Sequence, residues 1–308
     1  MENNIENDTK ADDEIDLREL FGVLLAGSRK IIAITAVFAF ISVIYALSVP
    51  NQYKATALLA PAQSNSSALP ALGGLSGLAS LAGVGLGGSK STEGQIAQEI
   101  MRSWSFIEGF INDSELAVEL VAAQGWSKTS NKLQINEDVY DTKNNQWLVE
   151  NESGVKGPPS SWELFQAFSD RLEVSEDKSG LVSVSFEYYS PEIAKQWLDM
   201  YVAAINAHMQ QRQILKVTNS INYLQVQIEK TSIAEMREVF YAIIEEQTKN
   251  KMLAEASPEY VFVAVSPSML PEVKSQPQRA LIFILGTLLG GILSALLVLL
   301  MHYARKSD

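Results

Sequence analysis

The sequence has 308 residues, of which 47% are hydrophobic, and its formal net charge at pH 7 is −12. This acidic balance argues against nucleic-acid binding, because nucleic-acid binders carry basic patches. The sequence contains no cysteine, which excludes disulfides and thiolate chemistry. Its two histidines, His208 and His302, lie far apart in the sequence, so we expect no histidine-based metal site and no cofactor.

Residues 1–30 are predicted to form a cytoplasmic tail that ends in a short amphipathic helix. Residues 1–19 are polar and acidic. Apolar residues then recur at three- and four-residue spacing, which places them on one helix face; they are Leu17, Leu20, Phe21, Leu24 and Leu25. We expect this helix to lie along the membrane surface and to end at Gly27.

Two uncharged segments, residues 31–49 and 280–301, are predicted to be transmembrane helices. At a rise of 1.5 Å per residue the second segment measures about 33 Å, enough to cross a bilayer core of about 30 Å. A cleaved signal peptide is the competing interpretation of the first segment, but such a peptide begins with a short basic region. The region before residue 31 is long and acidic, which favours a retained anchor.

Small residues form a stripe on the second transmembrane segment. Gly286 and Gly290 stand four residues apart, and Gly290/Ser294 and Gly291/Ala295 repeat this spacing. Such a stripe lets another helix backbone approach closely, so we predict helix–helix packing through these residues. The alternative is that glycine is simply common in membrane helices.

The approach to this segment is rich in proline, with Pro267, Pro271 and Pro277 ahead of Arg279. Because proline lacks a backbone donor and fixes φ near −65°, we expect an extended leader instead of a helix.

Two transmembrane segments place both termini on one side of the membrane. More basic residues flank the ends of the segments on the terminal side than on the loop side, which favours cytoplasmic termini: the former are Arg18, Arg29, Lys30, Arg305 and Lys306, and the latter are Lys54, Lys274 and Arg279. Residues 302–308 are then a second cytoplasmic tail, and residues 50–279 form one domain on the opposite side of the membrane.

This domain is predicted to contain an α/β base, residues 50–190 and 257–279. The clearest element is a hairpin in which Leu172 and Val174 precede a turn at 177–180, followed by alternating apolar and polar residues at 182–188. Further strands are expected at 53–60, 147–149 and 259–265. Helices are expected from Ser91/Thr92 to about Ser103, then to about Gln124 with a second start at Asp113/Ser114, and from Ser160/Ser161 to Phe168.

Residues 64–88 are almost wholly small or apolar and rich in glycine. A mobile loop is the first interpretation, because glycine-rich chains lose much backbone entropy on ordering. The alternative is a loop that contacts lipid or lines the inside of an oligomer. Gly83 and Gly88-Ser89-Lys90-Ser91 resemble a phosphate-binding loop, but one residue too many separates Gly88 from Lys90, so we reject nucleotide binding.

Residues 191–256 are predicted to form a long helical arm. Ser190 and Pro191 give a helix start, and neither proline nor glycine interrupts the pattern up to about Glu255. One continuous helix of this length would extend about 97 Å. Apolar residues at coiled-coil spacing predict self-association of the arm: Ile214, Val217, Ile221, Leu224 and Ile228.

The coiled-coil phase slips near Thr231/Ser232 and is resumed by Ile233, Met236, Phe240 and Ile243. Such a slip permits a bend or a change of partner.

Short motifs follow one another along nearly the whole chain. They are Ile15-Asp16-Leu17-Arg18-Glu19-Leu20; Pro50 with Tyr53-x-Ala55-x-Ala57; Ser190-Pro191-x2-Ala194-x2-Trp197; Ile205-Asn206; Ile221-x-Tyr223-Leu224; Tyr260-x-Phe262; and the proline leader. In this order they resemble the Wzz-type polysaccharide chain-length determinants, a family of polysaccharide co-polymerases. Residues 64–88 match none of its shared motifs.

The resemblance implies a bacterial inner-membrane protein with an α/β base and a long helix rising into the periplasm. It also implies a homo-oligomer that controls how many repeats a Wzy-type polymerase adds to a lipid-linked glycan such as O-antigen of lipopolysaccharide. Fold analogy alone carries this function.

Three functions are weighed on this basis, and the first is a non-catalytic regulator and scaffold. Neighbouring carboxylates such as Glu245/Glu246 diverge on a helix instead of converging on a site, so we expect no enzyme. The second is an adaptor that activates a separate tyrosine kinase in capsule or exopolysaccharide export. The third is a two-span sensor, which would need a larger cytoplasmic module than either tail offers.

Overall fold

The computed structural model describes residues 17–62, 89–150, 154 and 156–307. The predictions for the acidic tail before residue 17, for the segment 64–88 and for most of the decoy phosphate loop lie outside these residues. The chain divides into two compact units, Met1–Pro50 with Gln276–Asp308 and Asn51–Ser275.

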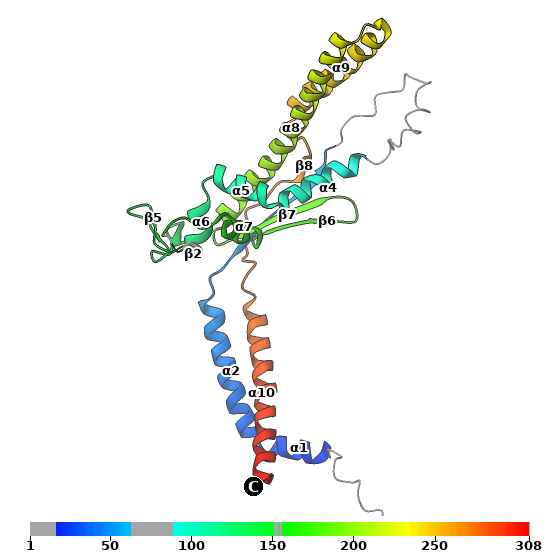
Figure 1. Cartoon of the computed structure of the whole chain (residues 1–308). Helices are drawn as coiled ribbons and strands as arrows, with labels where there is room; N and C mark the ends of the chain where they lie inside the picture. Colours follow the sequence, from blue (N-terminus) through cyan, green and yellow to red (C-terminus); the bar gives the residue numbers. More distant parts are fainter. Residues whose placement is uncertain (1–16, 63–88, 151–153, 155, 308) are drawn as a thin grey trace, which may run out of the picture. The chain divides into compact units, whose positions relative to one another are not determined.

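The first unit is a bundle of helices. It contains α1 (Leu17–Ala26), α2 (Ser28–Ser48) and α10 (Arg279–Ser307), and Gly27 separates α1 from α2. Helices α2 and α10 lie side by side along their lengths (Figure 1). Within the described part of the chain, Ser28–Ser48 and Arg279–His302 are the helices long and apolar enough to cross a membrane. Both predicted transmembrane segments are therefore confirmed as helices, and their length and apolar composition are sufficient to cross a membrane.

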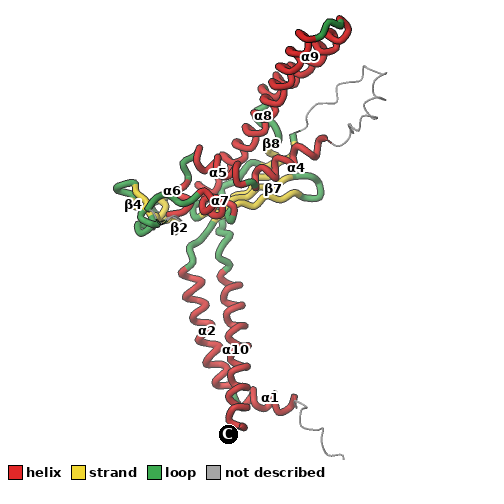
Figure 2. Tube along the Cα trace, viewed as in Figure 1, coloured by secondary structure: helices red, strands yellow, loops and turns green. Residues whose placement is uncertain are grey.

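The second unit is built on an antiparallel sheet, whose strands are yellow in Figure 2. Its strand order is β6-β7-β1-β8. Strand β1 (Tyr53–Pro61) pairs with β7 (Val182–Tyr188) from Tyr53↔Tyr188 to Leu59↔Val182. Strand β6 (Leu172–Glu176) pairs with β7 across a tight turn, which confirms the predicted hairpin. Strand β8 (Phe262–Ser266) closes the other edge against β1 and replaces the strand expected at 259–265.

Short helices pack on this sheet, and serine caps fix where two of them, α5 and α7, begin. The helices are α4 (Ser89–Arg102), α5 (Trp104–Asp113), α6 (Ala117–Ala122) and α7 (Ser161–Ser169). The Ser103 hydroxyl accepts the Phe106 N–H at the start of α5. Ser160 forms a reciprocal capping box with Glu163 at the start of α7, as the sequence predicts.

The second helix start predicted at Asp113/Ser114 is wrong. Ser114 is the residue that ends α5, and Glu115 after it adopts a positive φ of 54°, which interrupts the helical backbone. The chain resumes as α6, which ends at Ala122 and leads directly into strand β2 (Ala123–Ser127), paired with β3 (Lys132–Ile135). The strand expected at 147–149 is instead β5 (Gln146–Trp147), paired with β4 (Tyr140–Asp141).

An aromatic cluster fills the core between the sheet and the first turns of α8 (Pro191–Lys230). The Tyr201 ring lies 4.9 Å from that of Phe110 and 5.2 Å from that of Phe168, which in turn lies 4.8 Å from Phe186. The hydroxyls of Tyr201 and Tyr188 donate to the carbonyl oxygens of Met101 and Glu119. Burial raises the pKa of both phenols, so both remain protonated donors and tie the helices to the sheet.

The predicted continuous helix over 191–255 is wrong. Helix α8 (Pro191–Lys230) ends at Lys230, and α9 (Ala234–Glu255) begins after three non-helical residues and packs against α8. The chain turns at the place where the coiled-coil phase slips, and Thr231 and Ile233 there have extended ψ angles of 135° and 115°. Both residues are β-branched, which favours extended backbone. At 1.5 Å per residue α8 is about 60 Å long, so the arm is shorter than a single helix would make it.

Candidate functional site

Two helix–helix contacts carry most of the residues that the sequence analysis singled out, and the first is the contact between α2 and α10. A Cβ atom added to Gly286 would lie 1.8 Å from the Ser42 hydroxyl oxygen, and one added to Gly290 would lie 2.5 Å from the Phe38 Cβ. No side chain larger than hydrogen fits either position without a shift of α2. The two glycines therefore mark where the two backbones come closest.

The same contact continues toward the end of α10. Ser294 is fully buried, and its hydroxyl lies 3.3 Å from that of Thr35 on α2. Three of the four predicted packing residues thus lie on one face, and their neighbour is α2 of the same chain. The fourth, Gly291, points elsewhere, because a Cβ added there would meet nothing within 4 Å. The sequence cannot show this partner, because a small-residue stripe looks the same whichever helix covers it.

The end of the proline leader is tied to this helix pair. The Arg279 Nε group donates to the backbone carbonyl of Ala46 at 3.1 Å, near the C-terminal end of α2. Carbonyls in the last turn of a helix have no partner within it, and an arginine satisfies one of them here. Arg279 therefore holds the start of α10 against the end of α2, and Pro277 before it is buried.

The earlier part of the leader belongs to the second unit, where serines fix it. The Ser268 hydroxyl donates to the Asp199 carboxylate on α8, and the Ser275 backbone N–H donates to the Gln52 carbonyl oxygen at 2.8 Å. Pro267 is exposed and Pro271 half-buried. The prolines keep this segment non-helical, and the serines attach it. Sequence reasoning missed the serines, because only the folded chain brings their partners within reach.

The second helix contact is the pairing of α8 with α9. The five residues predicted to mediate self-association of the arm are each half-buried or buried; they are Ile214, Val217, Ile221, Leu224 and Ile228. Leu224 lines a shallow groove together with Ile243 and Gln247 of α9, so this face of α8 is turned toward α9. Association between copies through these five residues stays a prediction.

The contact face of α9 differs from the expected one. Ile233, Met236 and Ile243, which were expected to resume the seam, are exposed, and of that set Phe240 is half-buried. The less exposed positions recur at three- and four-residue spacing: Phe240, Ile244, Gln247, Lys251 and Ala254. Two of these five are polar, so a search for apolar periodicity selects the wrong face of the helix.

A buried asparagine joins the arm to the sheet. The Asn206 Oδ1 atom accepts the backbone N–H groups of Val261 and Phe262, both at 2.9 Å, and its Nδ2 donates to the Phe262 carbonyl at 3.0 Å. Gln210, one turn further along α8, donates to the Ala254 carbonyl at 2.8 Å. These amides fix where the chain leaves α9 and enters β8. Asn206 belongs to one of the motifs that resemble the family, but its hydrogen bonds are visible only in the structure.

The carboxylates with shifted pKa values lie apart and each has a local structural cause. Burial raises the pKa of Glu119, and the ion pair with Lys54, at 2.5 Å, lowers that of Glu173. Hydrogen bonds within their own turns lower the pKa values of Asp141 and Asp177. Catalytic sites bring perturbed groups together, and these four do not converge.

The histidines lie in separate surroundings. His208 contacts the Phe106 ring at 5.4 Å in the second unit, and His302 lies near the end of α10 in the first. Within the residues that the structure describes, no group of three or more His, Asp or Glu side chains is placed to hold a metal ion. What the described residues do provide is packing surfaces between helices and hydrogen bonds that join neighbouring elements.

Comparison with known proteins identifies a family for the first part of the chain. Residues 13–114 match the model of the Wzz chain length determinant protein family. No curated protein matches the chain. The match confirms the resemblance to Wzz-type polysaccharide co-polymerases predicted from the sequence, and with the two apolar helices it indicates a membrane protein.

Solved structures with similar descriptions are also found. A full-length bacterial polysaccharide co-polymerase is 15% identical over 95% of this chain and 99% of its own, with a TM-score of 0.39. A fragment of WzzB, a polysaccharide co-polymerase from Salmonella Typhimurium, is 13% identical over 73% of this chain and 100% of its own, with a TM-score of 0.27.

Proposed function

We propose that this chain, which carries a Wzz chain length determinant region at residues 13–114, is a non-catalytic regulator of polysaccharide chain length. In this proposal it acts as a homo-oligomeric scaffold in the bacterial inner membrane, on a Wzy-type polymerase and its lipid-linked glycan. The family match is the single observation that carries the proposal. The helix pair α2/α10 supplies the membrane anchor, and the pair α8/α9 supplies a rigid arm.

Exposed apolar side chains on the arm support association of several copies. Helix α8 exposes 64% of Tyr223 and 44% of Val226, and α9 exposes 59% of Tyr241 and 52% of Val239. Exposed large apolar side chains that lie together on a surface mark interaction sites in soluble domains. We propose that a second copy of the chain covers it, beside the inner face that α8 and α9 already share.

The proposed topology keeps both termini in the cytoplasm, as residues 1–30 and 302–308. Residues 31–49 and 280–301 cross the membrane, and residues 50–279 lie in the periplasm, with the base at 50–190 and 257–279 and the arm at 191–256. Because the chain has no cysteine, a single cysteine in place of Ser220 is a specific label site. We expect a membrane-impermeant maleimide to label this variant in intact spheroplasts. Protection there, with labelling after lysis, would invert the topology.

The function is tested by separating surface polysaccharides on a gel, from strains with and without the gene. We expect a narrow distribution of lengths with the gene, a broad one without it, and restoration by the wild-type gene. An unchanged O-antigen ladder together with loss of capsule or exopolysaccharide, dependent on a separate tyrosine kinase, would favour the adaptor function instead. Unchanged profiles of every surface glycan would contradict both.

A further inference from the structure

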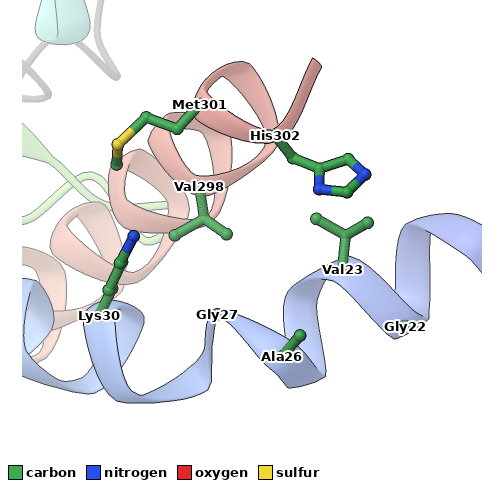
Figure 3. A pocket seen from close by; sticks show the side chains of 8 residues that line it. All are labelled: Gly22, Val23, Ala26, Gly27, Lys30, Val298, Met301 and His302. Atoms are coloured by element: carbon green, nitrogen blue, oxygen red, sulfur yellow. The ribbon is translucent and has the colours of Figure 1, made fainter. Parts of the chain in front are cut away.

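A pocket of about 520 Å³ lies within the first unit, where α1, α2 and α10 meet. Figure 3 shows its lining, with Gly22, Val23 and Ala26 on α1, Gly27 and Lys30 at the start of α2, and Val298, Met301 and His302 on α10. None of the predicted packing, leader or arm residues lines this pocket. It lies at the ends of both apolar helices.

The pocket exists because Gly27 lets α10 approach the junction of α1 and α2. A Cβ atom on Gly27 would lie 2.4 Å from Val298 Cγ1, so Val298 sits directly on the glycine and is almost fully buried. By contrast, a Cβ added to Gly22 would meet nothing within 4 Å. The lining is therefore tightly packed at Gly27, whereas Gly22 has room for a side chain.

The lining combines two nitrogen donors with apolar walls. The Lys30 and His302 side chains lie on either side of Val298, and the imidazole ring lies above Val23 (Figure 3). A lysine ammonium offers three donors and no acceptor, and an imidazole offers at least one N–H. The described lining thus joins a positive charge and N–H donors to apolar side chains, which suits an anion with an apolar attachment.

We infer that this pocket binds the phosphate head group of an anionic glycerophospholipid, with Lys30 and His302 donating to the phosphate and Val23, Val298 and Met301 contacting its glycerol and acyl region. A free phosphate ion would leave the apolar walls unused, whereas a lipid supplies apolar and anionic parts in one molecule. The pocket's place at the ends of the apolar helices fits the level at which head groups lie. This inference goes beyond the proposed function and does not depend on it.

The test is a lipid titration of the purified full chain in detergent, followed by native mass spectrometry. Phosphatidylglycerol and phosphatidylcholine with the same acyl chains are compared. We expect phosphatidylglycerol to bind about tenfold more tightly, and Lys30→Gln, which removes a charge, or His302→Leu, which removes the N–H donor, to lower its affinity about tenfold, the factor that corresponds to 1.4 kcal/mol. Gly22→Leu, which adds a side chain to the pocket lining, should weaken both lipids.

Arg29→Gln is the matched control, because Arg29 is the neighbour of Lys30, is exposed as Lys30 is, and does not line the pocket. It removes the same charge at the same end of the helices and should leave the affinity within about twofold, since only unspecific surface attraction is lost. Equal losses in Arg29→Gln and Lys30→Gln would reduce the site to general surface charge and overturn the inference.

Two further outcomes would also overturn it. Equal affinity of the wild-type chain for the two lipids would show that the phosphate charge is not recognised. Displacement of phosphatidylglycerol by millimolar glycerol 3-phosphate would show a free-anion site without a lipid component. If Lys30→Gln does not fold, as judged by its helical circular dichroism, His302→Leu and Gly22→Leu decide the question.

Discussion

The chain contains two antiparallel helix pairs that are packed in different ways. Helices α2 and α10 meet through Gly286 and Gly290, where no Cβ fits. Helices α8 and α9 meet through half-buried large side chains such as Leu224 and Phe240. Because lipid is as apolar as the helices it surrounds, burial of apolar side chains does not drive two membrane helices together. Their association depends on close approach of the backbones. In water the burial of large apolar side chains supplies the driving force.

The two pairs also leave different surfaces. Exposed apolar residues on α2 and α10 are expected for helices that face lipid. Exposed apolar residues on α8 and α9, such as Tyr223 at 64%, would face water instead of lipid in the proposed topology. This difference supports the proposal that a further partner covers the α8/α9 pair.

The largest effect is expected when the α8/α9 pair is broken within α8. Leu224→Pro removes a helical hydrogen bond and clashes with the preceding turn, at a cost of about 3 kcal/mol or more. Because the change lies beyond the core, hydrogen exchange should rise sharply in 215–255 while the amides of β1 and β7 stay protected. Ser232→Pro is the control, because Thr231 before it already has a ψ of 135°, as a following proline requires. Equal exchange in both variants would show that α8 is not stabilised as a continuous helix.

The next largest effect is expected in the α2/α10 pair. Gly286→Leu places a large side chain where Ser42 already lies within 1.8 Å of an added Cβ, and such overpacking costs about 1–3 kcal/mol. Gly291→Leu adds the same side chain where nothing lies within 4 Å and should be tolerated. Cysteines in place of Thr35 and Ser294, whose hydroxyl oxygens lie 3.3 Å apart, report the pairing as a disulfide.

This cross-link should form more slowly with Gly286→Leu and at the normal rate with Gly291→Leu. Equal slowing by both leucines would mean that α10 packs on more than one face. A cross-linking rate that stays normal in both variants would show that α2 is not the helix that meets Gly286.

The contrast between the pairs also explains what the sequence predicts and what it does not. The apolar segments, the hairpin at 172–188 and the caps at Ser160 and Ser190 are local signals, and each appears where it is expected. The end of α8 at Lys230 carries no proline or glycine, so the sequence shows a slip in phase but not a reversal. Which surfaces meet is decided by residues far apart in the chain.

The packing partners were for that reason the least predictable part. The stripe at Gly286 and Gly290 predicts a close helix contact but not that α2 supplies it. The inner face of α9 escaped prediction because Gln247 and Lys251 stand at two of its positions. The hydrogen bonds of Asn206 to Val261 and Phe262 span more than 50 residues of sequence, and no local sequence pattern predicts them.

A smaller effect tests the polar positions in that inner face. Gln247 lines the groove with Leu224 and Ile243, and Gln247→Leu adds apolar contact there without burying a charge. We expect the α8/α9 pair to gain about 1 kcal/mol, from the transfer of roughly one further methylene out of water. Glu246→Leu is the control, since Glu246 is exposed and surface changes stay within about 0.5 kcal/mol.

Hydrogen exchange of the α9 amides in the two variants measures the difference. Greater protection with Gln247→Leu and little change with Glu246→Leu would confirm the inner face of α9. The reverse ranking would place that face on the other side of the helix.

The smallest effect on stability is expected at the outer face of the arm. Tyr223 is 64% exposed, so Tyr223→Arg should change the stability of the single chain by no more than about 0.5 kcal/mol. If copies associate through this face, the same change buries an unpaired charge between them and should shift purified chains in detergent toward smaller assemblies. Gln225→Arg adds the same charge at another exposed position and should leave the assembly intact. Unchanged mass in both variants, measured by light scattering, would place the association elsewhere, and the exposed apolar residues of α8 would then need a different partner.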